Sequence, residues 1–251
     1  MLTNKTVFIT GASSGIGAAC AKEFAKLKAK LILCARRLDA LNNLSAELIE
    51  KHQVEVKCLP LDVRDYSGIQ TTLANLPAEW QAIDILINNA GLALGLESLE
   101  SGKVEEWEQV IDTNVKGLLY VTREILPQMV AKNSGHIINI GSTSAHDVYA
   151  NGSVYCATKF ALRAITKGLR LELAGKKIRV TEVDPGMVET EFSEVRFRGD
   201  KARAKKVYEN VEALTAEDIA DAIAYCATRP LRVNVNELIL TPADRTFTRP
   251  V

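Results

Sequence analysis

The feature that most constrains the fold of this chain is a set of short runs that are apolar at nearly every position. The runs VFIT, LILCA, ILIN and IINI do not alternate between apolar and polar residues, and each is followed by a helical pattern. A strand that is apolar on both faces needs helices on both sides, which is typical of a parallel sheet. Because parallel connections cross over with a right hand, we predict a single-domain α/β fold with a doubly wound, Rossmann-like sheet across residues 1–251.

The expected elements alternate along the chain without a linker, an internal repeat or a low-complexity segment. We predict strands at Lys5–Thr10, Leu31–Ala35, Val54–Leu59, Ile83–Asn88, His136–Ile140 and Ile178–Val183, and a short tail strand at Leu238–Leu240. We predict helices from Gly15 to Ala29 and at 39–51, 67–76, 104–133, 153–174 and 216–228.

The stretch 187–214 breaks this alternation, because it is polar, mixed in charge and inserted after the strand that ends at Val183. An insertion at the carboxyl end of a strand lies over the ligand crevice of such a fold. We interpret it as a substrate lid, and the alternative is a solvated pair of surface helices.

Composition excludes several classes of protein. The chain has 251 residues, of which 47% are hydrophobic, and its 31 basic side chains balance 31 acidic ones. This apolar fraction argues against disorder, and the zero net charge argues against nucleic-acid binding. No run of about 18 apolar residues and no signal peptide is present, so we expect a soluble cytoplasmic protein without a membrane partner. The five cysteines form no C-x-x-C pair and the three histidines no ligand spacing, so we expect no metal and no disulfide framework.

A glycine-rich turn follows the first strand. The segment Thr10–Gly17 reads TGASSGIG, whose spacing differs from the common G-x-G-x-x-G fingerprint. Its glycines still allow backbone N–H groups to approach a pyrophosphate, and the helix that opens at Gly15 presents its positive end. Because the turn lies in a strand–helix–strand unit, we favour nucleotide binding over a plain connection. The candidate residues are Gly11, Ser13, Ser14, Gly15, Ile16 and Gly17.

The end of the second strand bears on which nicotinamide cofactor would bind. An NAD site places a carboxylate there to bond the ribose 2′-hydroxyl, but this sequence has Arg36 and Arg37. Two guanidinium groups suit a 2′-phosphate, so we predict NADP. The alternative is a basic turn before a helix that Asp39 caps.

Several motifs, taken in order along the chain, resemble those of the short-chain dehydrogenase/reductase family. They are TGASSGIG (10–17), Asp62-Val63, NNAG (88–91), Asn114, Ser142, YCATK (155–159), and Pro185-Gly186 followed by Thr190. Segments 76–95, 136–145 and 188–200 are similar to those of the NADP-dependent 3-hydroxy acid dehydrogenases, whose substrates include serine and allo-threonine. Many NADP-preferring relatives carry a basic residue inside the glycine turn, where this sequence has Ser14. Phosphate recognition would then rest on Arg36 and Arg37, helped by Ser13.

The expected chemistry centres on Tyr155 and Lys159. They are four residues apart at the start of a helix that Ser153 could cap, so both project from one face. A phenol has an ordinary pKa of about 10, and a neighbouring ammonium favours the phenolate. We expect Lys159 to lower the pKa of Tyr155, Tyr155 to be the general acid/base, and Ser142 to polarise the substrate oxygen. A solvent-facing tyrosine is the alternative for the pair alone.

The resemblance implies further roles. Asn114 would perturb its helix backbone and support a water relay to Lys159, which would also hold the nicotinamide ribose beside Tyr155. Asp62 could instead be a helix-capping acid. The resemblance implies these cofactor contacts: Asp62 and Val63 at the adenine; Asn89, Ala90 and Gly91 at its ribose; Pro185, Gly186, Val188 and Thr190 at the carboxamide.

The leading functional prediction is an NADP-dependent interconversion of small 3-hydroxy acids and 3-oxo acids. A substrate carboxylate needs a partner, and we expect Arg196 to bind it, with Arg198 as the other candidate. Tyr149 and His146 are possible pocket residues. The alternatives are the reduction of another small aldehyde or ketone, such as a sulfonated or semialdehyde substrate, and a non-catalytic NADP sensor. The resemblance implies a homotetramer or homodimer paired through helices 104–133 and 153–174, with the tail 238–251 at a second interface.

Overall fold

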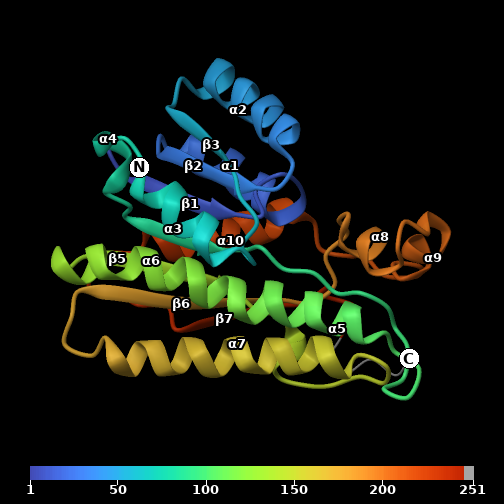
Figure 1. The fold of residues 1–251 in the computed structure, drawn as a ribbon. Coiled ribbons are helices and arrows are strands. Elements are labelled where there is room, and N and C mark those ends of the chain that lie inside the picture. The colour runs from blue at the N-terminus through green and yellow to red at the C-terminus, as the bar shows by residue number, and fades with distance from the viewer. Residues whose placement is uncertain (246–251) are drawn as a thin grey trace.

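A seven-stranded parallel sheet organises the computed structural model, which describes residues 1–245 (Figure 1). The order of the strands is β3-β2-β1-β4-β5-β6-β7. Their bounds are β1 Thr6–Thr10, β2 Lys30–Ala35, β3 Val56–Pro60, β4 Ile85–Asn88, β5 Gly135–Ile140, β6 Ile178–Pro185 and β7 Glu237–Leu240. Every pairing is parallel, so the predicted doubly wound α/β fold is confirmed.

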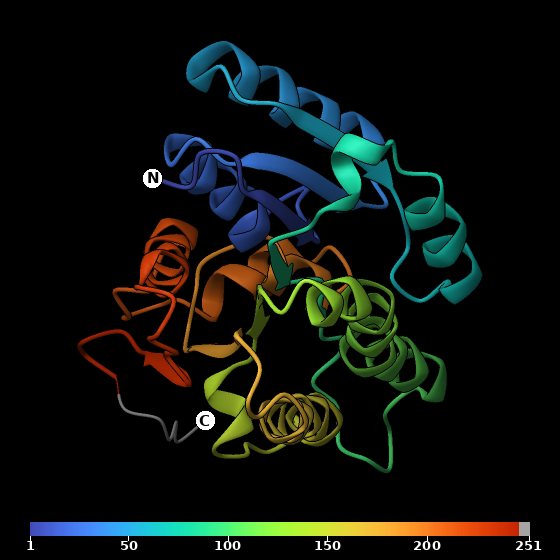
Figure 2. The ribbon, with the colours of Figure 1, turned by 90° about the vertical axis from the view of Figure 1, so that its left-hand side faces the viewer.

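Helices cover both faces of this sheet (Figure 2). On one face α1 packs against both α10 and α2, and on the other α3 contacts α6 and α5 contacts α7. The bounds are α1 Gly15–Lys26, α2 Leu38–His52, α3 Tyr66–Ala74, α4 Ala78–Gln81, α5 Val104–Ile111, α6 Leu118–Ala131, α7 Ser153–Glu172, α8 Phe192–Arg196, α9 Lys201–Lys206 and α10 Ala216–Thr228. The two faces carry separate apolar cores, which is why the strands are apolar on both sides.

The helix predicted at 104–133 is not regular throughout. Residues Asp112–Gly117 form a π-helical turn, η1, between α5 and α6. The side chain of Asn114, in the middle of this turn, hydrogen-bonds both backbone groups of Leu92. Single π-helical turns of this kind occur frequently at functional sites.

The segment 187–214 leaves the sheet after β6 and returns to it. Its two ends are joined by backbone bonds from Glu189 N to Leu214 O (2.8 Å) and from Leu214 N to Met187 O (2.9 Å). Between these ends lie α8 and α9, which project beyond the carboxyl end of β6 in Figure 1.

Among residues 1–245 no helix is long and apolar enough to cross a membrane. The tail predicted to serve a second interface includes residues 246–251, which lie outside the described residues.

Candidate active site

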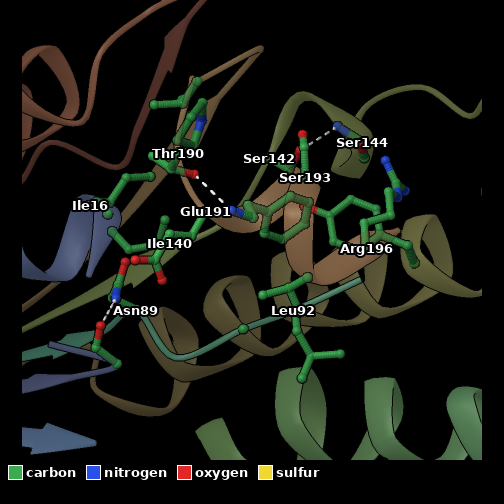
Figure 3. Close-up of a pocket in the computed structure, with 18 of the residues that line it drawn as sticks. Ile16, Asn89, Leu92, Ile140, Ser142, Ser144, Thr190, Glu191, Ser193 and Arg196 are labelled. Carbon is green, nitrogen blue, oxygen red and sulfur yellow. Dashed lines mark hydrogen bonds between the residues drawn. The ribbon is translucent and has the colours of Figure 1, made fainter. Parts of the chain in front are cut away.

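One cavity of about 640 Å³ lies at the carboxyl ends of the strands, where the chain order reverses between β1 and β4. Open α/β sheets bind their ligands at this switch point. Figure 3 shows Ser142, Ser144 and Arg196 in one part of the cavity and Ile16 and Asn89 in another. The predicted residues that line it are Gly11, Ser13, Ser14, Gly15, Ile16, Arg36, Arg37, Asp62, Val63, Asn89, Ala90, Gly91, Ser142, Tyr155, Lys159, Pro185, Gly186, Val188, Thr190 and Arg196. Gly17 and Asn114 lie behind this lining.

The glycine turn packs as closely as its spacing predicts. Gly11 has φ +65°, and a Cβ atom on Gly17 would lie 2.3 Å from the carbonyl oxygen of Gly11. Helix α1 begins at Gly15 as predicted, without an acidic residue in its first turn and without a side-chain cap from Ser14. Its first backbone N–H groups therefore have no side-chain acceptor, and they form an anion-binding helix end beside the cavity.

Asn89 fastens this turn to the end of β4. Its side-chain amide donates to the carbonyl oxygens of Thr10 (2.9 Å) and Gly11 (3.2 Å). In return, the hydroxyl of Thr10 accepts from the backbone N–H groups of Asn89 (3.0 Å) and Ala90 (2.9 Å). Residues predicted from two separate motifs thus form one connected wall of the cavity.

Arg37 extends from the end of β2 across the mouth of the glycine turn. Its Nη2 donates to Ser14 Oγ (2.8 Å) and Ser13 Oγ (3.2 Å), and it also pairs with Glu191 Oε2 (3.0 Å). Helix α2 begins after Arg37 without a side-chain cap, and Asp39 lies in its first turn. The alternative in which Asp39 caps this helix is therefore wrong.

Asp62 lies beside the cavity but does not cap a helix. Its carboxylate binds the guanidinium of Arg64, with Oδ2 2.6 Å from Nη2, and this bond lowers the pKa of Asp62. The cap of α3 is Asp65, which accepts from the N–H of Gly68 (3.0 Å). The capping alternative for Asp62 is therefore wrong.

Tyr155 and Lys159 project from one face of α7, as predicted. The Nζ atom of Lys159 donates to the carbonyl oxygen of Ile140 (2.9 Å) and lies 5.8 Å from the ring centroid of Tyr155. Burial lowers the pKa of Lys159 to about 8, against the opposing effect of the Asp184 and Glu182 carboxylates. Ser153 is the first residue of α7, not its cap, because Gly152 occupies the cap position.

The pKa of Tyr155 differs from the sequence prediction. Burial raises it, although a hydrogen bond with Ser142 and the charge of Arg196 act in the opposite direction. The expectation that Lys159 lowers this pKa is wrong for the residues as they lie here, because desolvation of the phenolate dominates. The hydroxyl of Ser142 also accepts from the N–H of Ser144 (3.1 Å), which fixes its direction (Figure 3).

Asn114 connects three segments behind the cavity. Its Oδ1 accepts from Leu92 N (2.9 Å), and its Nδ2 donates to Leu92 O (2.8 Å) and to Thr158 Oγ1 (3.0 Å). Thr158 is the neighbour of Lys159 on α7. Asn114 therefore holds the loop after β4 against the helix that carries the tyrosine and the lysine.

Arg196, the last residue of α8, and Arg198, two residues further on, have different contacts. Arg196 lies 5.3 Å from the ring centroid of Tyr155, donates to the hydroxyl of Tyr149, and leaves its buried Nε without a partner. Arg198 lies outside the cavity lining and binds Glu106, with distances of 2.6 and 2.7 Å, and Glu97 (3.2 Å). Of the two candidates, only Arg196 faces the cavity.

Sequence reasoning missed several residues of the site. The ring centroid of Phe192 lies 5.7 Å from that of Tyr155. The hydroxyl of Tyr208 hydrogen-bonds Ser193 Oγ on α8 (2.7 Å) and donates to the carbonyl oxygen of Val188 (3.0 Å).

Asp184 at the end of β6 is fully buried and accepts a hydrogen bond from Ser142 N (3.0 Å). The sequence signal that could have identified Asp184 is an acidic residue inside a strand of buried residues. His146, a possible pocket residue, instead contacts Asp184 Oδ2 (2.8 Å), whereas Tyr149 does line the cavity.

Comparison with known proteins agrees with this geometry. Residues 5–201 match the model of the family described as short chain dehydrogenase. Two similar proteins bear the name NADP-dependent 3-hydroxy acid dehydrogenase: one from Salmonella typhi (48% identity, 96% of each chain) and one from Schizosaccharomyces pombe (47%, covering 97% of this chain and 95% of the relative). A solved structure described as the closed form of serine dehydrogenase complexed with NADP+ aligns with a TM-score of 0.92, at 47% identity over 96% of each chain. This chain belongs to the short-chain dehydrogenase family.

Proposed function

We propose that this protein is an NADP-dependent oxidoreductase that interconverts small 3-hydroxy acids, such as serine, allo-threonine or 3-hydroxyisobutyrate, and the corresponding 3-oxo acids. The observation that carries the proposal is the arrangement around Tyr155, where Ser142, Lys159 and the guanidinium of Arg196 lie at one cavity. A proton donor and a fixed cation side by side suit a substrate with both a carbonyl and a carboxylate. The names of the relatives support the same substrate class.

The residues present fit NADP. The open N-terminus of α1 and the closely packed Gly11 and Gly17 suit a pyrophosphate, and Arg36 and Arg37 at the end of β2 suit a 2′-phosphate. When bound, NADP supplies the acceptor of the hydride in oxidation, and its reduced form supplies the donor in reduction. Around it we assign the adenine to Asp62 and Val63, its ribose to the 89–91 segment, and the carboxamide to the 185–190 segment.

In this proposal Tyr155 is the general acid and base. Its raised pKa keeps the hydroxyl protonated at neutral pH, so it is ready to donate a proton to the carbonyl oxygen during reduction. The hydroxyl of Ser142, which is hydrogen-bonded to that of Tyr155, would also hydrogen-bond the carbonyl oxygen of the substrate. In the oxidation direction Tyr155 has to give up its proton, which the hydrogen bond with Ser142 and the charge of Arg196 favour.

We assign the substrate carboxylate to Arg196. Its Nε is buried without a hydrogen-bond acceptor, a costly state that an incoming carboxylate would relieve. Because Arg196 lies on α8, the segment 187–214 would act as a lid that brings the cation to the substrate. The relative solved as a closed form supports this interpretation.

We further propose that the protein acts in the cytosol as a homotetramer or homodimer. Its five cysteines all lie within the described residues and are free, which suits a reducing compartment. Helices α5, α6 and α7 leave large apolar side chains exposed, as an interface between copies would require: Val104, Ile111, Leu119, Phe160 and Leu171. Sedimentation equilibrium tests the subunit number, and a monomer at micromolar concentration would contradict this part.

An oxidation screen tests the function directly. Serine, the threonine isomers and 3-hydroxyisobutyrate are offered with NADP or NAD, and formation of the reduced cofactor is followed by absorbance. We expect turnover of at least one acid with NADP, and a loss of roughly 10²- to 10⁴-fold in kcat for Tyr155→Phe. In a companion screen with NADPH, turnover of neutral aldehydes or ketones alone would favour the second candidate substrate class. NADP binding without turnover of any compound would favour a sensor.

A further inference from the structure

Strand β6 buries two acidic side chains where apolar residues are the rule. Glu182 and Asp184 each have no exposed surface, and they are two positions apart, so both point to the same face of the sheet. That face is the one covered by α7, because Arg170 of α7 lies 3.8 Å from the carboxylate of Glu182. Acidic residues are almost never fully buried unless they are paired, so each needs a structural explanation.

The carboxylate of Asp184 holds both ends of the turn that carries Ser142. Its Oδ1 accepts from the N–H of Ser142 (3.0 Å), and its Oδ2 lies 2.8 Å from Nε2 of His146. Between these two residues lies only the short helix η2, Thr143–Ala145. A Cβ atom on Gly141 would lie 1.8 Å from Asp184 Oδ1, so the glycine is what lets the carboxylate approach the backbone this closely.

Helix α7 supports the same turn from the other side. Arg163 donates to the carbonyl oxygen of Ala145 (3.2 Å) and pairs with Glu237 (3.1 Å), which lies 3.4 Å from Nε2 of His146. The ligand atoms of His146, Asp184 and Glu237 lie within 4.8 Å of one another, a spacing that a metal ion could use. Since Arg163 and Lys159 already bring positive charge to these carboxylates, the cluster is better explained as a scaffold.

We propose that Asp184 is a positioning residue for Ser142, which it aims at Tyr155 through its bonds to the Ser142 backbone and the His146 ring. The inference rests on the role proposed above for Ser142. A donor to a reacting oxygen has to be placed to within a few tenths of an ångström, and a flexible turn could not supply that precision. A buried carboxylate that is held by two directed hydrogen bonds can place the turn with that precision.

A double-mutant cycle tests this inference. We expect Asp184→Ala to lower kcat roughly 10- to 100-fold while the dissociation constant for NADP stays close to that of the parent. In a Ser142→Ala background the same change should cost nothing further, because the group that Asp184 aims is already gone. Equal losses in both backgrounds would overturn the inference. If Ser142→Ala alone left kcat unchanged, the role proposed for Ser142 would fail instead.

Three further variants separate positioning from charge and from folding. Asp184→Asn keeps an acceptor for the N–H of Ser142 and should recover most of kcat, whereas a variant as slow as Asp184→Ala would contradict the inference. Glu182→Gln replaces an equally buried acid on the same strand that has no hydrogen bond to Ser142, so kcat at pH 7 should stay close to the parent. A loss equal to that of Asp184→Ala would count against positioning. His146→Ala removes the ring that Asp184 Oδ2 contacts but keeps the bond to Ser142 N, and it replaces Asp184→Ala in the cycle with Ser142→Ala if Asp184→Ala does not fold.

Discussion

Replacing Arg196 by Met is the sharpest test of how this site would recognise an acid. The guanidinium lies between aromatic rings, with centroids at 5.3 Å for Tyr155, 5.4 Å for Tyr149 and 6.0 Å for Phe192. Methionine keeps an unbranched apolar chain against these rings but removes every N–H donor. The substitution therefore subtracts the charge and leaves most of the packing.

The expected magnitude follows from the burial of the pair. Truncating one partner of a buried, hydrogen-bonded charge pair costs about 2–5 kcal/mol, much of it from leaving the other charge unpaired. Such a loss corresponds to a decrease of roughly 30- to 5,000-fold in kcat/KM. Only a substrate with a carboxylate should suffer it, since a neutral substrate makes no such pair.

The assay compares 3-hydroxyisobutyrate with its methyl ester, which has the same carbon skeleton without the charge. Arg196→Met should lose kcat/KM on the acid and change little on the ester. Arg198→Met is the matched control, because Arg198 lies in the same segment but binds Glu97 and Glu106. Any effect of this control should be the same on both substrates. Equal losses on acid and ester for Arg196→Met would refute the carboxylate contact.

Three other predictions concern the cofactor site and stability. Arg37→Met should raise the dissociation constant for NADP by roughly 10- to 150-fold, the value of a lost charged contact of about 1.5–3 kcal/mol, and leave that for NAD unchanged by calorimetry. Gly17→Ala places a Cβ atom 2.3 Å from the Gly11 carbonyl oxygen and should abolish NADP binding, whereas Gly168→Ala, with open space around it, should raise the thermal midpoint. Burial lowers the pKa of His136 well below its ordinary value of 6.5. Below pH 6.5 the unfolded state therefore binds a proton at this histidine that the folded state does not bind, and the free energy of unfolding decreases as the pH falls. In urea titrations His136→Gln should therefore gain stability on the parent, on the order of 1 kcal/mol, between pH 8 and pH 5.5.

The fold was predictable because its signal is local and repeated. Each apolar run indicates that both faces of its strand are covered, and four strands of this kind leave few alternatives to a doubly wound sheet. The glycine turn was equally predictable from the sequence, because Gly11 and Gly17 are needed for one close approach between backbone atoms. The order of the strands and the reversal beside β1 then placed the cavity.

Contacts between distant parts of the chain were not predictable in this way. Nothing in the sequence distinguishes Arg196 from Arg198, and only the position of Glu97 and Glu106, about 90–100 residues earlier, takes Arg198 out of the cavity. The π-helical turn around Asn114 depends on the backbone of Leu92, which approaches it through tertiary packing. The alternative in which Asp62 caps α3 named the wrong acid, because Asp65 holds the cap position and Asp62 binds Arg64 instead.

The pKa values of Tyr155 and Lys159 depend most on burial, and the acids of β6 oppose its effect on Lys159. Burial favours the neutral form of each group, so it raises the pKa of Tyr155 and lowers that of Lys159 to about 8. As the pH rises, the lysine would therefore lose its proton before the tyrosine does, and the cation would be gone when a phenolate is needed. The carboxylates of Asp184 and Glu182 oppose that loss, because each favours the ammonium. Burial still outweighs the two acids, so their effect is to limit how far the pKa of Lys159 falls, not to prevent the fall.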